Sequence, residues 1–221
     1  ANTAEKIGAP LCRECFIRLE SFCCHFHCPL NFSDVNLVGV AQGGVPTDMT
    51  TMARMIGNLP HPAFGLAFAA AIGMAREYPD SIRLEDKLTP EGWGLYEQLR
   101  GRCTATLLTL GAFRSVPMVL AGGDLLAEEG LMRAFADNSI RLSPDVPRVP
   151  VFMWHARTDP LVPFWDAEET ARRYCREGAA LTWQPGIAPE HLMGAVEKLP
   201  AAFDWLQQRF DGVPAGAACQ V

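Results

Sequence analysis

The sequence has no cluster of lysine and arginine residues and no long hydrophobic run. Its 19 lysine and arginine residues are outnumbered by 25 aspartate and glutamate residues, which gives a formal net charge of -6. A polyanion would be repelled, so we exclude nucleic acid as a partner. The longest apolar run, residues 64–75, has 12 residues, fewer than the roughly 20 that span a bilayer. We therefore expect no transmembrane segment.

We also expect no signal peptide from this sequence. The first residues read ANTAEKIGAPLCREC, without a basic segment followed by an apolar stretch and a small-residue cleavage site. The chain alone therefore does not name a compartment. With 221 residues, of which 49% are hydrophobic, it can form one large domain or one domain with a cap.

The eight cysteines form two sets. Three lie far apart and suit disulfides in an oxidising compartment, namely Cys103, Cys175 and Cys219. The other five crowd into one short segment beside two histidines, namely Cys12, Cys15, Cys23, Cys24, His25, His27 and Cys28. These side chains could hold zinc, but a second Cys-x-x-Cys and a regular histidine pair are lacking. We therefore predict no metal and interpret residues 1–34 as an atypical segment.

Three short β-branched and apolar runs alternate with amphipathic segments, which is typical of an α/β fold with a parallel sheet. The predicted strands are VNLVGVA (35–41), RVPVFMWHA (148–156) and AALTWQP (179–185). The interval 46–147 contains no strong strand pattern, and it predicts an inserted helical lid or cap. Beyond the second strand we expect a helix capped by Asp166, then a loop at 186–194 and a closing helix at 200–212.

Two polar residues follow the second and third predicted strands. Asp159 comes after one strand and His191, 32 residues later, after the next. The carboxyl ends of parallel strands share one edge of a sheet, where reacting groups gather, and a Ser-Asp-His relay places its last two members in this order. Alone, Asp159 would be interpreted as a turn residue and His191 as a surface side chain. His155, within the strand, is expected to be a core histidine.

Several segments together resemble the fungal secretory lipases, the family of lipase A from basidiomycete yeasts. They include NLVGVAQGG, VPVFMWHARTDPLVP and PGIAPEHLMGAVEKLP, in the same order and with similar spacing from about Asn36 to the end. The resemblance implies the C-terminal half of an α/β-hydrolase fold, with the core at 35–45 and 148–221 and the lid at 46–147. It also implies secretion, ester and triacylglycerol substrates, no cofactor, and Asp159 and His191 as catalytic acid and base.

The family's Gly-x-Ser-x-Gly nucleophile motif is absent, because none of the six serines has glycines at that spacing. We therefore identify no nucleophile and expect the chain to be inactive, with the N-terminal half of the sheet missing. The resemblance further implies a Cys175–Cys219 disulfide and leaves Cys103 unpaired. It also suggests that the lid touches a lipid interface.

Two other interpretations stay open. One is a non-catalytic lipid- or partner-binding protein, with zinc at its N-terminus. The other is a related α/β-hydrolase, such as a peptidase or acyltransferase, that uses the same aspartate and histidine.

Overall fold

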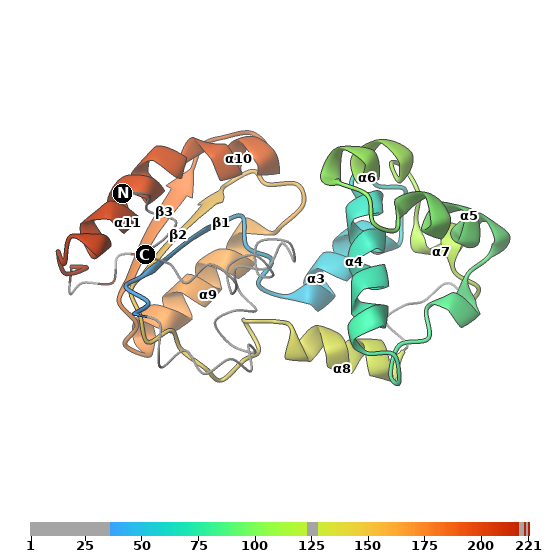
Figure 1. The fold of residues 1–221 in the computed structure, drawn as a ribbon, viewed down its shortest axis with the longest axis horizontal. Helices are drawn as coiled ribbons and strands as arrows, with labels where there is room; N and C mark the ends of the chain where they lie inside the picture. Colours follow the sequence, from blue (N-terminus) through green and yellow to red (C-terminus); the bar gives the residue numbers. More distant parts are fainter. Residues whose placement is uncertain (1–35, 123–127, 217–218, 220) are drawn as a thin grey trace. The chain divides into compact units, whose positions relative to one another are not determined.

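A computed structural model describes residues 36–122, 128–216, 219 and 221. The chain divides into two compact units, drawn in Figure 1. The sheet unit comprises the chain up to Val45 together with residues 144–159 and 167–221, and the helical unit comprises residues 46–143 and 160–166. Each unit has its own hydrophobic core.

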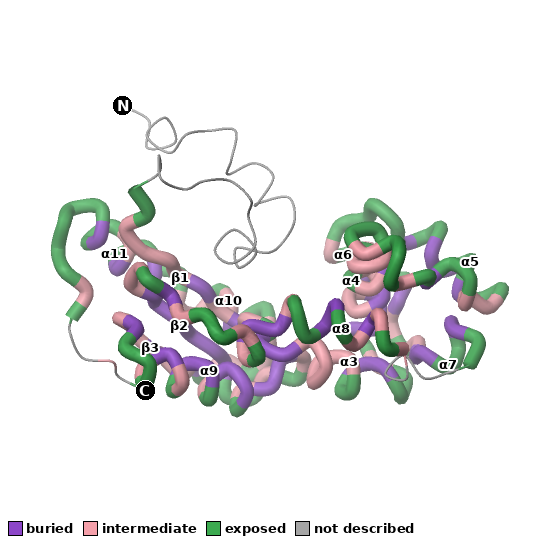
Figure 2. The backbone as a smooth tube through the Cα atoms, turned by 90° about the horizontal axis from the view of Figure 1, so that it is seen from below, coloured by how far each residue is buried: buried purple, intermediate pink, exposed green. Residues whose placement is uncertain are grey.

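The sheet unit is built on three parallel strands in the order β1-β2-β3. The strands are β1 (Val40–Gly43), β2 (Val151–Ala156) and β3 (Leu181–Gly186). Val151 is in register with both Val40 and Leu181, so the three strands begin at the same level. All six residues of β2 are buried, as Figure 2 shows along the strand. A central strand covered on both faces explains why its sequence is almost continuously apolar.

Within residues 128–216, three helices accompany this sheet. They are α9 (Phe164–Arg176), α10 (His191–Glu197) and α11 (Leu199–Phe210). In Figure 1, α10 and α11 lie along one face and α9 along the other. Phe152, Trp154 and Trp205 form the centre of the core beneath α11. The strand–helix–strand order therefore gives the layered arrangement expected from the sequence.

Outside residues 123–127, the helical unit contains seven short elements. They are α3 (Met49–Gly57), α4 (Phe64–Glu77), the 3-10 helix η3 (Glu85–Lys87), α5 (Pro90–Leu99), α6 (Thr104–Leu110), α7 (Val116–Val119) and α8 (Glu129–Asp137). Asp48 caps α3 and Thr89 caps α5, each by accepting backbone N–H groups with its side chain. The described part of this unit forms isolated β-bridges but no strand. A helical insertion was the expectation for this region.

Three local expectations were wrong. The first strand begins at Val40, because its partner β2 begins at Val151 after Pro150, whose carbonyl accepts the Val40 N–H. Asp166 is not a cap but lies in the first turn of α9, with its carboxylate 2.9 Å from the Arg141 guanidinium. The interval after β3 is not a loop throughout, because α10 begins at His191.

Candidate active site

The turn after β2 is held against the turn after β3. Its backbone closes through a hydrogen bond from the Asp159 N–H to the Ala156 carbonyl, at 3.3 Å. The Thr158 hydroxyl donates to the Ala188 carbonyl at 3.2 Å, which links the two turns directly. Both turns follow carboxyl ends of parallel strands, where polar side chains from neighbouring strands meet.

His191 occupies the first position of α10. The helix begins there because the Glu190 carboxylate accepts the N–H groups of Leu192 and Met193, which the helix itself leaves unsatisfied. The preceding turn is fixed from the other end of the helix, where the Glu197 carboxylate accepts the Ile187 and Ala188 N–H groups. The backbone that carries His191 is thus held on both sides.

Asp159 and His191 form a hydrogen-bonded pair. Asp159 Oδ2 lies 2.7 Å from His191 Nδ1, and the aspartate side chain is 1% exposed whereas the histidine side chain is 23% exposed. A carboxylate only accepts hydrogen bonds, so the imidazole donates from Nδ1, and a neutral ring that does so keeps a lone pair on Nε2. This tautomer has the form of a general base that receives a proton at Nε2.

His155 is a third member of this cluster that the sequence analysis did not assign to the site. Its side chain is fully buried in β2, as expected of a core histidine, and its Nε2 lies 3.2 Å from Asp159 Oδ2. The contact spans four residues, from the strand into the turn. That spacing was visible in the sequence as HARTD, but it does not reveal that the chain turns back at this point.

Two glycines at the end of β1, Gly43 in the strand and Gly44 just after it, lie against Trp154 and His191 respectively. An ideal Cβ on Gly44 would come 2.8 Å from His191 Cε1, and one on Gly43 would overlap the Trp154 indole. The indole Nε1 donates to the Gly194 carbonyl at 3.1 Å, in the helix that carries His191. These glycines allow β1 to approach the imidazole and the indole as closely as it does.

The described residues offer no nucleophile elbow. Their serines all lie within residues 46–143 and none follows a strand, namely Ser81, Ser115, Ser139 and Ser143. Ser139 is buried, donates to the Phe135 carbonyl and accepts the Met49 N–H, so its hydroxyl holds two helices together. Ser21 and Ser33 lie outside the described residues.

The zinc alternative also falls outside the described residues, where all its ligands lie (Cys12, Cys15, Cys23, Cys24, His25, His27 and Cys28). Elsewhere, in the part of the chain that the structure describes, no group of three metal-binding side chains is found. No helix of the described ranges is long and apolar enough to cross a membrane.

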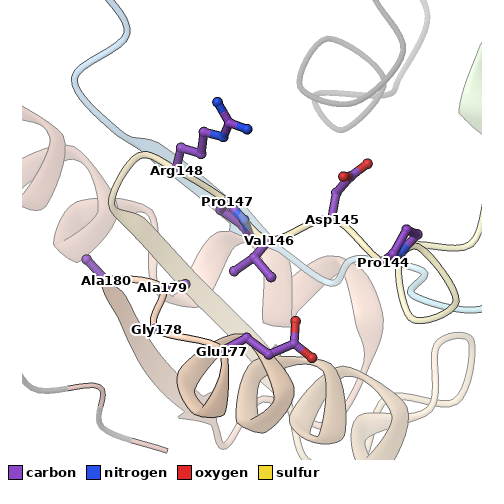
Figure 3. A pocket seen from close by; sticks show the side chains of 9 residues that line it. All are labelled: Pro144, Asp145, Val146, Pro147, Arg148, Glu177, Gly178, Ala179 and Ala180. Carbon is purple, nitrogen blue, oxygen red and sulfur yellow. The ribbon is translucent and has the colours of Figure 1, made fainter.

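Figure 3 shows a pocket of the sheet unit that is distinct from this cluster. It is lined by residues 144–148, which precede β2, and 177–180, which join α9 to β3. It therefore lies at the amino ends of the strands, whereas Asp159 and His191 follow their carboxyl ends.

The disulfide implied by the family resemblance is present. Cys175 near the end of α9 is bonded to Cys219 in the C-terminal tail, across 44 residues. Cys103 is an exposed free thiol.

The chain is similar to known lipases over most of its length. A family model described as secretory lipase matches residues 24–218. The secreted triacylglycerol lipase LIP7 of Malassezia globosa is 33% identical over 85% of the chain and 41% of its own length. Lipase A of Moesziomyces aphidis is 25% identical over 84% of the chain and 42% of its length. The chain thus spans about two fifths of these relatives.

Solved structures are similar to this chain in fold. Candida antarctica lipase A in its closed state aligns with a TM-score of 0.75 and 25% identity, over 86% of this chain and 47% of the other. The esterase LipA of Xanthomonas oryzae, at 16% identity and a TM-score of 0.62, covers 91% of the chain and supports the fold alone. The parallel sheet and its helices are part of an α/β-hydrolase fold, and the chain belongs to the secretory lipase family.

Proposed function

We propose that Asp159 and His191 are the acid and base of an ester hydrolase that acts on triacylglycerols and related esters. The observation that carries this proposal is the 2.7 Å hydrogen bond between Asp159 Oδ2 and His191 Nδ1. In such a relay, His191 Nε2 takes the proton of a nucleophile and later returns it to the leaving group. Asp159 holds the required tautomer and stabilises the imidazolium. The names of the relatives support the substrate class.

We further propose that the 221-residue chain by itself does not turn over esters. A general base without a nucleophile has nothing to activate, and the sequence has no Gly-x-Ser-x-Gly motif. A fluorophosphonate probe, which labels activated serines, tests this on the folded chain beside a His191→Ala control. We expect no labelling of either. Labelling that disappears in His191→Ala would mean that an unrecognised serine completes the relay.

The helical unit is proposed as a lid that contacts lipid. Its position in the sequence, inserted between β1 and β2, supports this role, as does its share of exposed apolar side chains. Phe113 and Leu59, for example, are 64% and 75% exposed. Extracellular location is proposed on the names of the secreted relatives and on the disulfide.

The proposed roles of Asp159 and His191 can be tested by activity only in a protein that has a nucleophile. A chimera supplies one when residues 36–221 replace the matching segment of the Malassezia globosa lipase. We expect it to hydrolyse short-chain triacylglycerols, and His191→Ala or Asp159→Asn to lower kcat by about 10⁴-fold. Full activity of both variants in an active chimera would refute the assignment.

A further inference from the structure

His155 contacts the same Asp159 oxygen as the proposed base, His191. Asp159 Oδ2 lies 3.2 Å from His155 Nε2 and 2.7 Å from His191 Nδ1. The two imidazoles come from different elements, His155 from β2 and His191 from α10. The carboxylate is therefore contacted both from the strand before it, β2, and from the helix after β3.

Packing alone does not explain a histidine at this point of β2. Every residue of the strand is buried, and His155 itself is 0% exposed. Burying an imidazole costs free energy unless it hydrogen-bonds, whereas an apolar side chain of similar size would fill the same space without that requirement. A polar ring here is explained by the carboxylate that it faces.

The buried Asp159 carboxylate in turn requires hydrogen-bond donors. The Asp159 side chain is 1% exposed, and an ionised carboxylate removed from water needs several donors. His191 provides one donor through Nδ1. Because a carboxylate only accepts, the contact with His155 requires a proton on His155 Nε2.

We propose that His155 is a positioning residue for Asp159, an inference that rests on the proposed function. Its Nε2–H holds the carboxylate with Oδ2 turned toward His191 Nδ1. The same hydrogen bond stabilises part of the negative charge of Asp159. Without this donor the Asp159 carboxylate is held less firmly, and so is the His191 ring that it orients. The effect of His155 on catalysis passes through Asp159, the carboxylate that it contacts.

The tautomer of His155 tests the proposal in the unmodified 221-residue chain. Nitrogen-15 NMR of labelled histidine distinguishes a ring protonated on Nε2 from one protonated on Nδ1. We expect the Nε2–H form, with a hydrogen-bonded proton that exchanges slowly with water. A His155 ring in the Nδ1–H form would overturn the proposal, whatever the chain's activity.

Two substitutions separate positioning from packing. His155→Gln keeps an N–H donor at nearly the same place, and His155→Leu keeps an apolar side chain without a donor. We expect the low-field proton signal of His191 Nδ1 to persist in His155→Gln and to be lost or to exchange at least tenfold faster in His155→Leu. Equal signals in both folded variants would show that His155 only packs. Should His155→Leu fail to fold, His155→Met serves as the donor-free variant.

The chimera adds a kinetic measurement. There His155→Leu should lower kcat by about 10- to 100-fold with KM nearly unchanged, and His155→Gln should restore most of it. If His155→Leu leaves kcat unchanged in an active chimera, the positioning role is refuted but the proposed function is not. An inactive chimera would count against the proposed function, and the NMR result would still decide the role of His155 in holding Asp159.

Discussion

The His191 imidazole lies where a side chain on Gly44 would begin. An ideal Cβ on Gly44 comes 2.8 Å from His191 Cε1, and Gly44 has a φ of 62°. Both features require glycine, because other residues are strained at this φ and any Cβ would push the ring aside. The turn after β1 thus limits where the His191 ring can lie.

Substituting Gly44 with alanine should therefore do two things. The backbone strain alone should destabilise the chain by roughly 1–2 kcal/mol, and displacement of His191 should weaken its hydrogen bond to Asp159. NMR of the His191 Nδ1 proton measures the second effect. Gly212→Ala is the matched control, since Gly212 has a φ of 78° and no atom within 4 Å of its ideal Cβ. An intact His191 signal in Gly44→Ala would contradict the contact.

Part of this site could be predicted from the sequence. Asp159 and His191 were recognisable because each follows a strand that its own composition reveals, and parallel strands bring their carboxyl ends together. Their 2.7 Å contact agrees with that reasoning, while their catalytic roles stay a prediction. The helical character of the region between β1 and β2 was predictable because residues 46–147 contain no strong strand pattern.

The rest depended on contacts that no local pattern contains. His155 looked like a core residue because its partner lies across a turn of unknown geometry. The start of α10 was missed because Glu190 is an uncommon cap, although its carboxylate accepts two N–H groups of the helix. Asp166 was taken for a cap because its pairing with Arg141 joins residues far apart in the sequence.

The Cys175–Cys219 disulfide should be a major source of stability. It closes a loop across 44 residues, and loop-closure entropy predicts stabilisation by about 3–4 kcal/mol. The double variant Cys175→Ser/Cys219→Ser should show that loss in denaturant unfolding. Cys103→Ser, which removes an exposed free thiol, is the control and should change the free energy of unfolding by less than about 0.5 kcal/mol. Equal stability of the double variant and the wild type would contradict the prediction.

Glu197 should stabilise the turn before His191 in a pH-dependent way. Hydrogen bonds from the Ala188 and Ile187 N–H groups, with help from Lys198, outweigh burial and hold the pKa of Glu197 below its usual value. A lowered folded-state pKa gives stability that is present above the unfolded pKa, about 4.3, and lost as pH falls through the folded pKa. Glu197→Gln should therefore cost about 1 kcal/mol at pH 7 and almost nothing at the acid end.

Hydrogen exchange of the Ile187 and Ala188 N–H groups measures this effect locally. Glu169→Gln is the control, because Glu169 pairs with Arg176 at the surface and is 53% exposed. Its removal should leave both N–H groups protected. Equal protection in Glu197→Gln and wild type at pH 7 would show that the carboxylate does not hold the turn.

Substituting Arg141 should destabilise the helical unit strongly, although the side chain is 35% exposed. Its Nε lies 3.1 Å from Asp48 Oδ2 and 2.9 Å from Asp166 Oδ1. Both carboxylates are nearly inaccessible, with side chains 4% and 1% exposed. The guanidinium therefore ties together the start of α3, the segment after α8 and the start of α9. Removing one partner from a buried ion pair leaves an uncompensated charge.

Arg141→Met should accordingly destabilise the chain by about 3–5 kcal/mol at pH 7. Burial alone would raise the pKa of Asp48, but the Arg141 hydrogen bond and charge and the Thr51 and Thr50 N–H groups outweigh it and lower the pKa. The stabilisation is thus complete above the unfolded pKa and lost as pH falls through the folded pKa, so the difference from wild type should shrink below about pH 4.

The control for this substitution is Arg133→Met. Arg133 also pairs with a carboxylate, Glu129, but the two side chains are 72% and 85% exposed. Such a pair contributes less than about 0.5 kcal/mol, because water screens it and both side chains lose freedom in forming it. Chemical unfolding of both variants between pH 3 and pH 7 gives the comparison. Similar effects of the two substitutions, or a difference that does not depend on pH, would mean that Arg141 does not neutralise the two buried carboxylates.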